Sequence, residues 1–404
     1  MKKIVGAALA LLVVIGPIVG LVDVIPAGAV IGSATVMTTP DAGSFSNTLL
    51  SVSCVSSTWC AAVGNVNSGT ALRTLVMIWD GRQWATAPSP SPGTGDSSLQ
   101  SVSCVSSTWC AAVGYTTIGP EAQLLVVQWD GTNWSSVDVP DFGGATTGLS
   151  AVSCVSSASC AAVGGFKSGG QSRSLTLTWD GDAWAYVSSP NASTASNMLY
   201  ALSCVSATWC MAVGAYIGGG TANVLIMEWN GSSWTIDRSL ESTAMVPSLT
   251  SVSCLTVSMC VAVGSHSIGA VRSLVVIWNG TTWSEVVDPS TSSTSMAAVS
   301  CVLPDACTIV GSHDDGSGGL PADRRSSVLT WDGQFWNEVS TASVGAVVNT
   351  LAAVSCTSMF ACVAVGHRGV GTVDQTLALS LTSREPSVLL PGGIDEPVAP
   401  AYTG

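Results

Sequence analysis

The stretch CVSSTWCAAVG at residues 54–64 returns letter for letter at residues 104–114 and decides the fold. Its first cysteine recurs in steps of 50, 50, 50, 50, 47 and 55 residues, at Cys54, Cys104, Cys154, Cys204, Cys254, Cys301 and Cys356. These cysteines mark seven units, which start near residues 49, 99, 149, 199, 249, 296 and 351. A fixed period of this length is the sequence signature of a repeat architecture.

Each unit consists of short β-type runs separated by turn residues. SVSC and CAAVG form the first two runs, and a longer apolar run such as LVMIW at residues 75–79 forms the third. Asp-Gly or Asn-Gly then precedes a further tryptophan, which is a strong hairpin signal. Both alternating sets of side chains in LVMIW are apolar, so this strand must be covered on both faces. Four-stranded sheets stacked around a ring provide that cover, and roughly 40 to 50 residues per sheet is the propeller period.

The units resemble the blades of a seven-bladed β-propeller of the kelch-like or Asp-box-like repeat kind, of the secreted bacterial type. Most units have one glycine after the second run, such as Gly64, where kelch blades have two. The turn DGRQW at residues 80–84 lacks one residue of the Asp-box pattern S-x-D-x-G-x-x-W. The resemblance implies an all-β ring with four antiparallel strands per blade. The catalytic residues of Asp-box sialidases have no counterpart in this chain.

The two ends of the repeat region predict how the ring closes. The seventh unit stops after its third run, with no Trp-Asp-Gly and no fourth strand. Residues 34–40 parallel residues 84–90, which carry the fourth run of the first unit. We therefore expect strand 34–40 to complete blade 7, within a propeller that spans residues 30–383. Such closure pairs strand edges that are otherwise open.

The N-terminal segment indicates export. Lys2 and Lys3 precede an uncharged stretch at residues 4–22 and a small-residue site that ends at Ala29. This pattern predicts a signal peptide at residues 1–29, with an N-terminal anchor as the alternative, and a secreted or cell-surface location. Residues 384–404 hold four prolines and are expected to form a flexible tail. The net charge of −13 disfavours nucleic acid and anionic membranes as partners.

The 14 cysteines occur as seven pairs with five residues between the members. In an exported protein this spacing predicts a disulfide within each first hairpin. Zinc ligands are usually spaced two to four residues apart and no histidine accompanies the pairs, so buried free thiols are the remaining alternative. The predicted pairs are Cys54 with Cys60, Cys104 with Cys110, Cys154 with Cys160, Cys204 with Cys210, Cys254 with Cys260, Cys301 with Cys307 and Cys356 with Cys362.

The repeats separate structural positions from functional ones. A residue that stands at the same offset in every blade serves the fold, so a site is expected where the blades differ. The varying segments include residues 65–73, 115–123 and 312–325, together with the links between blades. In a propeller these loops lie on one face, and variable loops on a scaffold commonly bind ligands. Unrestrained drift of the loop sequences is the alternative.

Two groups of polar residues in these loops are candidate sites. Three histidines follow the second cysteine of blades 5, 6 and 7 by five or six residues, and long polar side chains recur six residues before the third-strand tryptophan. A histidine patch would make ligand capture depend on pH between about 5 and 7. The candidate ligand-binding residues are His266, His313, His367, Arg272, Arg325 and Asp315. A calcium site is a further hypothesis, on Asp314, Asp315 and Asp323; no other cofactor or metal is expected.

Two classes of function are compatible with the sequence. The first is a monomeric, secreted or cell-surface binding scaffold that engages an extracellular protein or glycan through its loop face. The alternative is an extracellular hydrolase or lyase with its site at the mouth of the central channel. The chain has three histidines and no recognisable nucleophile motif, which favours the binding scaffold over an enzyme.

Overall fold

The repeated tryptophans and the turn between them fix the outer edge of each unit. Strand β4 (Leu72–Trp79) ends at the tryptophan before Asp80 and Gly81, and β5 (Trp84–Ala87) begins at the next tryptophan. Gly81 has a φ of 91°, in the left-handed region that glycine adopts without strain. The Asp80 Oδ1 atom accepts hydrogen bonds from the N–H groups of Arg82 and Gln83, each at 2.8 Å. This local bonding sets the tight turn that every outer hairpin uses.

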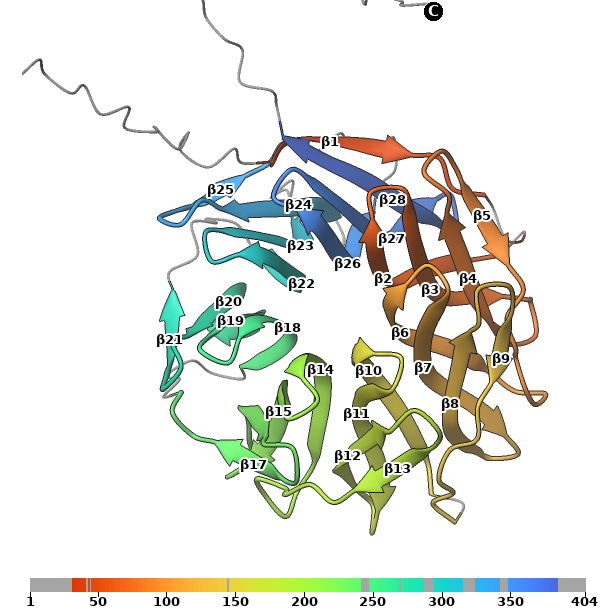
Figure 1. Cartoon of the computed structure of the whole chain (residues 1–404), viewed down its shortest axis with the longest axis vertical. Helices are drawn as coiled ribbons and strands as arrows, with labels where there is room; N and C mark the ends of the chain where they lie inside the picture. Colours follow the sequence, from red (N-terminus) through yellow and green to blue (C-terminus); the bar gives the residue numbers. More distant parts are fainter. Residues whose placement is uncertain are drawn as a thin grey trace, which may run out of the picture.

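The hairpins assemble into a ring of seven blades, each an antiparallel sheet of four strands, among the residues that the structure describes (Figure 1). The computed structural model describes residues 31–40, 43, 45–143, 145–240, 247–268, 270–286, 294–314, 324–341 and 348–383. This confirms the all-β, seven-bladed propeller that the repeat predicts. None of these residues belongs to a helix that is long and apolar enough to cross a membrane.

Each of the first six blades contains four strands that are consecutive in the chain and run from the centre of the ring outward. The remaining strands are β2 (Asn47–Ser56) and β3 (Trp59–Asn67); β6 (Ser97–Ser106), β7 (Trp109–Ile118), β8 (Glu121–Trp129) and β9 (Trp134–Ser136); β10 (Thr147–Ser156), β11 (Ser159–Ser168), β12 (Gln171–Trp179) and β13 (Trp184–Val187); β14 (Asn197–Ser206), β15 (Trp209–Gly218), β16 (Thr221–Trp229) and β17 (Trp234–Asp237); β18 (Ser248–Thr256), β19 (Met259–Ile268), β20 (Ala270–Trp278) and β21 (Trp283–Val286); β22 (Thr294–Leu303), β23 (Ala306–Asp314), β24 (Arg324–Trp331) and β25 (Trp336–Glu338); and, in blade 7, β26 (Asn349–Ser358), β27 (Ala361–Val370), β28 (Val373–Ser383) and β1 (Ile31–Met37).

Strand β1 closes the ring by pairing with β28. Its antiparallel register runs from Ile31 opposite Ser383 to Met37 opposite Ala378. The strand starts and ends three residues before the expected segment 34–40, because the pairing with β28 already begins at Ile31. The Thr39 hydroxyl, just beyond β1, donates to the Thr376 carbonyl at 3.2 Å. The first described strand therefore completes the last blade, as the missing fourth run predicts.

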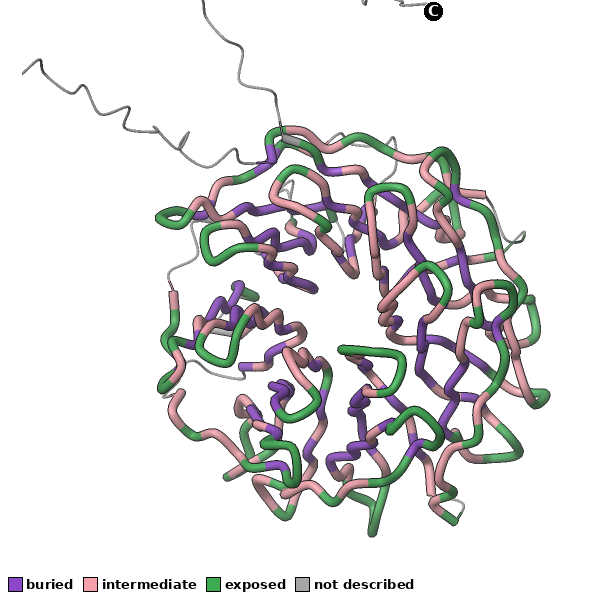
Figure 2. Tube along the Cα trace, in the orientation of Figure 1, coloured by how far each residue is buried: buried purple, intermediate pink, exposed green. Residues whose placement is uncertain are grey.

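The hydrophobic core consists of layers between adjacent blades. One layer joins Leu49 and Met77 of blade 1 to Val365 and Ala378 of blade 7, and similar layers follow around the ring. Figure 2 shows this pattern as buried strand centres and exposed turns. The tryptophan that starts the fourth strand of blades 1 to 6, such as Trp84, is buried in these layers. Both faces of every inner sheet are thus covered, which explains why both side-chain sets of the third strand are apolar.

All 14 cysteines lie in the described residues and form the seven disulfides that the spacing predicts. Each disulfide joins residues that are directly opposite in the first hairpin of a blade, for example Cys54 and Cys60. Disulfides persist in oxidising compartments. Seven of them in one domain indicate an extracellular or similarly oxidising environment. The predicted signal peptide at residues 1–29 and the tail at residues 384–404 lie outside the described residues.

The serine of each Ser-Cys pair links its blade to the next one. The Ser53 hydroxyl accepts a hydrogen bond from the N–H of Cys104, and the same bond recurs at 3.0 Å between all adjacent blades. The Cys54 N–H bonds Ser355 of blade 7, so the set of seven bonds is closed. In a non-hydrogen-bonded cross-strand pair the N–H points away from its partner strand. The neighbouring blade therefore satisfies a donor that the hairpin itself leaves unpaired.

The glycine of Cys-Ala-Ala-Val-Gly is required by a bulge in the innermost strand. The register of β2 and β3 shifts between Leu49 and Ser51, opposite Gly64. A Cβ atom at Gly64 would lie 2.0 Å from the Thr48 carbonyl oxygen, and the equivalent approach in the other six blades is 2.0 or 2.1 Å. No side chain fits there without moving the backbone. This close approach explains why the glycine occurs in all seven units.

Candidate functional site

The propeller has two faces of different character. The loop face carries the connections from the second to the third strand and from the fourth strand to the next blade. These two kinds of loop bond one another: Leu72 N–H donates to the Asp96 carboxylate at 2.8 Å. The turn face carries the first hairpin turns and the outer Asp-Gly or Asn-Gly turns, which the Trp79 indole joins by donating to the Ser57 carbonyl. The predicted placement of all variable loops on one face therefore agrees with these bonds.

The turn face is uniform because the same bonds recur in most blades. The indoles of Trp129, Trp179, Trp229 and Trp278 donate to equivalent carbonyls at 2.9 to 3.1 Å. Backbone N–H donors in the outer turns lower the pKa of the aspartates at this position below the ordinary 3.8, and Thr132 adds a side-chain bond that is the main cause at Asp130. Asn230 accepts the same pair of turn bonds in blade 4. A position that tolerates asparagine in this way serves the turn and does not supply a catalytic carboxylate.

Two of the long polar side chains on the loop face hold the links between blades. The Arg73 guanidinium donates to the Gly95 carbonyl at 3.1 Å. The Arg173 guanidinium donates to the carbonyls of Ser193 and Ala195 at 3.3 and 3.2 Å. These bonds assign a structural role to the arginines of blades 1 and 3. Arg272 and Arg325, both candidate ligand-binding residues, have exposed positions at the start of the third strands of blades 5 and 6.

The three candidate histidines lie on second strands and occupy two different positions. His266 is opposite Arg272, and His313 is opposite Arg325. His367 is opposite Thr376, one residue out of step, so that Arg368 takes the place of the other two histidines in blade 7. Successive side chains of a strand point to opposite sides of the sheet. The structure therefore groups His266 with His313 and separates His367 from them.

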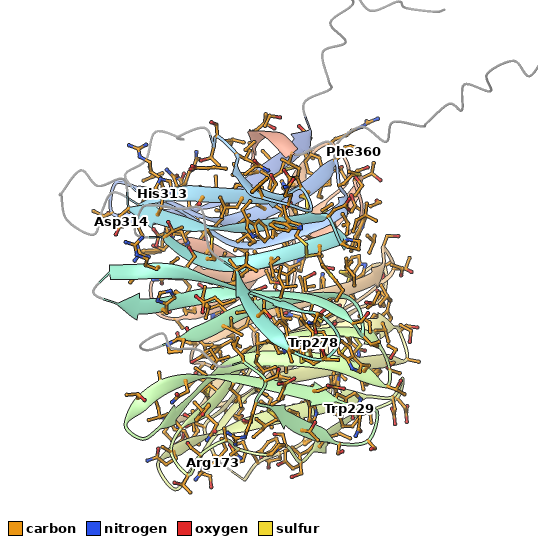
Figure 3. All side chains as sticks on the ribbon, turned by 90° about the vertical axis from the view of Figure 1, so that its left-hand side faces the viewer. Arg173, Trp229, Trp278, His313, Asp314 and Phe360 are labelled. Atoms are coloured by element: carbon orange, nitrogen blue, oxygen red, sulfur yellow. A yellow bond between two sulfur atoms is a disulfide. The ribbon has the colours of Figure 1, made fainter. Side chains whose placement is uncertain are left out.

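The calcium hypothesis is only partly within the described residues. Asp314 lies at the loop-face end of β23, next to His313, and Figure 3 shows both on the side of the molecule opposite to Phe360. Its carboxylate is 4.0 Å from the Arg324 guanidinium. Asp315 and Asp323 lie outside the described residues. Across the part of the chain that the structure describes, no three metal-ligating side chains gather.

A pocket of about 490 Å³ opens on the loop face where blades 2, 3 and 4 meet. The residues that line it include Gln100 and Tyr115 of blade 2, Leu149, Phe166 and Lys167 of blade 3, and Met198 of blade 4. Its volume lies within the range of about 300 to 1,000 Å³ that is typical of ligand sites. This pocket combines aromatic and aliphatic walls with a few polar groups, which is the usual composition of a binding site.

The pocket exists because two opposed glycines replace side chains in blade 3. Gly148 and Gly165 are cross-strand partners, whereas the same pair in blade 1 is Thr48 and Asn65. In blade 1 the Asn65 amide donates to Ser98 of the next blade and fills the seam. In blade 3 a Cβ at Gly148 would have a single neighbour, the Cβ of Tyr115 at 3.8 Å, so a side chain fits there without a clash. The two missing side chains create the hollow.

The electrostatics of the pocket are simple. Burial, and secondarily the negative charge of Asp96, raises the pKa of Tyr115 above 10.0, so its hydroxyl is neutral at physiological pH. Lys167 is exposed at the rim and is the only lysine after Lys3 in the chain. The hydroxyl of Thr146, a lining residue of the pocket, donates a hydrogen bond to the Glu121 carboxylate. The lining offers apolar side chains, neutral hydroxyl and amide groups and one cation, and the Glu121 carboxylate is bonded to one of its threonines.

Sequence reasoning did not find this pocket. The available signal was Gly164-Gly165, the one place where the repeated glycine is followed by a second glycine. Recognising it requires the register, which shows that Gly165 faces the neighbouring blade and that Gly148 is opposite.

Comparisons with known proteins support the fold. No family model and no curated protein matches the chain. The structure titled YCF48 bound to D1 peptide is similar with a TM-score of 0.54 and 14% identity, covering 88% of this chain and 97% of that one. YCF48 from Cyanidioschyzon merolae has a TM-score of 0.53 at 14% identity, covering 87% and 98%. The GH74 xyloglucanase from Xanthomonas campestris has a TM-score of 0.52 at 11% identity, covering 84% of this chain and 54% of that one.

Proposed function

We propose that this protein is an extracellular binding scaffold that holds a protein ligand on its loop face. The observation that carries the proposal is the contrast between the two faces. The turn face repeats the same indole and carboxylate bonds from blade to blade. The loop face varies in sequence and contains a pocket that a single blade creates by losing two side chains.

A protein ligand is favoured over a glycan by the chemistry of that pocket. A sugar ring presents hydroxyls around its edge, and each needs a hydrogen-bond partner when it is buried. Three lining residues of the pocket, Leu149, Phe166 and Met198, offer no such partner, alongside polar ones such as Gln100 and Tyr115. The similar propeller YCF48 binds a peptide, according to the description of its complex, which is consistent with this class of partner.

An enzymatic role has less support. The likeness to the GH74 xyloglucanase is at 11% identity and concerns the fold alone. The turn aspartates, such as Asp80 and Asp180, are occupied by bonds to the backbone of their own turns. Binding without turnover is therefore the proposed activity of the loop face. Hydrolysis of a xyloglucan or peptide by the purified protein, lost on mutation of a loop carboxylate, would contradict it.

The test compares equal changes on the two faces. Ile118 and Ile217 are exposed on the loop face, and Val257 and Phe335 are exposed on the turn face. Peptides are selected on the wild-type protein from a display library of random twelve-residue peptides. Their binding is then measured to four variants: Ile118→Glu, Ile217→Glu, Val257→Glu and Phe335→Glu. We expect peptides that bind wild type and both turn-face variants, and that bind at least one loop-face variant about tenfold more weakly.

Two outcomes would contradict the proposal. One is a library that yields no peptide bound by the folded wild-type protein. The other is a set of peptides whose binding is lost in the turn-face variants and kept in both loop-face variants. Selection of glycans but not peptides from a parallel array would replace the protein ligand with a glycan.

A further inference from the structure

We infer that the pocket between blades 2, 3 and 4 accepts a large apolar side chain of a peptide, next to a carboxylate that pairs with Lys167. This inference rests on the proposed function and specifies which ligand chemistry the loop face selects. It makes the pocket a specificity site within a larger contact surface. Three features support it: the apolar side chains of the lining, the charge of Lys167, and the difference between blade 3 and the other blades.

The interior of the pocket matches an apolar group. Leu149 is 1% exposed, and Tyr115, Phe166 and Met198 are half-buried beside it. The Phe166 ring is held by Phe142 at a centroid distance of 5.7 Å. The side chains of Leu149, Phe166 and Met198 offer no strong hydrogen-bond partner to a polar group that loses its water beside them. An aromatic or long aliphatic side chain gains burial there at no such cost.

Met198 gives the pocket an adjustable wall. Its Sδ atom lies 2.4 Å from the point where a Cβ of Gly165 would stand. The thioether therefore occupies part of the space that the glycine leaves. Methionine is flexible and polarisable, so it can shift to fit side chains of different shape. This favours a class of large apolar side chains over one particular residue.

The rim supplies the one positive charge among the lining residues of the pocket. Lys167 follows Phe166 directly on β11 and lines the pocket mouth. The chain has a net charge of −13, so its overall field repels acidic ligands. Among the described residues, the one ion pair within 4.0 Å is between Arg324 and Asp314, so no such pair engages the Lys167 ammonium. A carboxylate next to the bound side chain places its charge at this cation.

The comparison of blades shows that the pocket is a local departure from the repeat. At the two glycine positions the other blades have Thr48 with Asn65, Ser98 with Tyr115, Met198 with Ala215, Ser248 with Ser265, Ser295 with Ser312, and Thr350 with His367. Each of those pairs has at least one larger side chain. Replacing one of the two glycines by the residue of another blade therefore fills the pocket with a side chain that this fold already accommodates at the equivalent position.

The experiment uses the full-length protein and peptides selected from the random library. Gly148→Thr copies the residue of blade 1 and fills the space beside Tyr115, where the added Cβ meets nothing closer than 3.8 Å. Ser295→Thr places threonine at the equivalent position of blade 6, outside the pocket, and is the control for the position. Lys167→Ala removes the rim charge, and Lys167→Arg keeps it. Fluorescence anisotropy of labelled peptides measures affinity, and thermal unfolding verifies that each variant is folded.

The expected selection is a peptide motif with Phe, Tyr, Trp, Leu, Ile or Met next to Asp or Glu. We expect Gly148→Thr to weaken its binding at least about tenfold, and Ser295→Thr to leave it unchanged. Lys167→Ala is expected to weaken binding about two- to fivefold and to reduce its salt dependence, whereas Lys167→Arg retains both. Replacing the peptide carboxylate by an amide should reproduce the Lys167→Ala result.

The outcomes separate this inference from the proposed function. If the peptides still bind Gly148→Thr with wild-type affinity but are lost in Ile118→Glu, the loop face binds ligands and the pocket inference is overturned. A motif without large apolar residues overturns it as well. If a Lys167→Ala variant binds as wild type, the assignment of the carboxylate is overturned. A library with no bound peptide removes both proposals.

Discussion

Single serines form hydrogen bonds between all adjacent blades. The serine before the first cysteine of each blade accepts a hydrogen bond from the N–H of the first cysteine of the next blade. Some blades have a second serine, two residues earlier, which accepts from another N–H of the next blade. Ser51, Ser101 and Ser251 accept from the valine N–H of the next blade at 3.1 or 3.2 Å. The other four blades have alanine there, at Ala151, Ala201, Ala298 and Ala353. The hydroxyl is thus an optional addition at one position and invariant at the other.

Removing an invariant serine is expected to destabilise the ring. Ser53→Ala leaves the Cys104 N–H without its partner, which costs about 1 to 2 kcal/mol of unfolding free energy. Ala201→Ser is expected to add a bond to the Val252 N–H and to raise stability by up to about 1 kcal/mol. Guanidinium unfolding at equilibrium measures both. Ser57→Ala, which copies Ala207 of blade 4, is the control, and equal stability of Ser53→Ala and this control would contradict the role of the bond.

The turn aspartates predict an acid-dependent stability. Turn N–H groups, helped by a hydroxyl or an amide in two blades, lower the pKa of Asp80, Asp130, Asp180 and Asp332 below 3.8, so the folded state binds fewer protons than the unfolded chain. Their contribution is therefore present above pH 3.8 and is lost as the pH falls through the folded values. Changing all four to asparagine keeps the turn bonds, as Asn230 and Asn279 do. We expect that variant to show a smaller drop in denaturation midpoint between pH 5 and pH 2.5; an equal drop would contradict this account.

At the scale of the element, the first hairpin of each blade is a self-contained unit. Its disulfide joins residues only six apart in the sequence, its turn has a local bond from the Thr58 N–H to the Ser56 hydroxyl in blade 1, and its bulge is made possible by one glycine. Such hairpins form from local contacts. The spacing of the cysteines therefore predicted their pairing, because the two cysteines of a hairpin are close in sequence and recur together in every unit.

Loss of one disulfide is expected to have a similar effect in different blades. The variant Cys104→Ala with Cys110→Ala should lower the free energy of unfolding by about 2.4 kcal/mol, since it frees a ring of seven residues in the unfolded chain. Cys254→Ala with Cys260→Ala should cost about the same. Chemical denaturation measures both, and non-reducing peptide mapping verifies the other six pairs. A much larger loss in one blade would show that its disulfide does more than hold a hairpin.

The elements also show where sequence reasoning was sufficient and where it was not. The seven-fold period and the Asp-Gly turns predicted the ring, because each is a local signal that recurs along the chain. The one unit without a fourth strand predicted the closure, because it departs from that repeat. The offsets already separated the histidines: His266 and His313 follow their cysteines by six residues and His367 by five. In a strand this single residue moves the side chain to the other face. The pocket was missed because it is made by absent side chains on two strands that only the register brings together.

At the scale of the whole molecule, closure by β1 determines whether blade 7 has an open edge. Removing residues 1–40 exposes β28 and takes Ile31 from the layer between blades 6 and 7. We expect one cooperative unfolding transition at lower denaturant concentration and increased self-association, because an open strand edge pairs with other chains. Calorimetry and light scattering measure these. Truncation after Ser383 is the control, and identical melting of the two truncated proteins would contradict the closure.

The same closure orders the events of biosynthesis. β1 leaves the ribosome first, yet its partner β28 is made nearly 350 residues later, at the end of the propeller. Joining ends so distant costs about 3.6 kcal/mol more in chain entropy than closing a six-residue hairpin. Blades 1 to 6 are therefore complete in the chain before β28 is made, and β1 stays without its partner strand throughout that time. Until then its backbone N–H and C=O groups can pair with other chains, so premature pairing is the risk that this way of closing the ring carries.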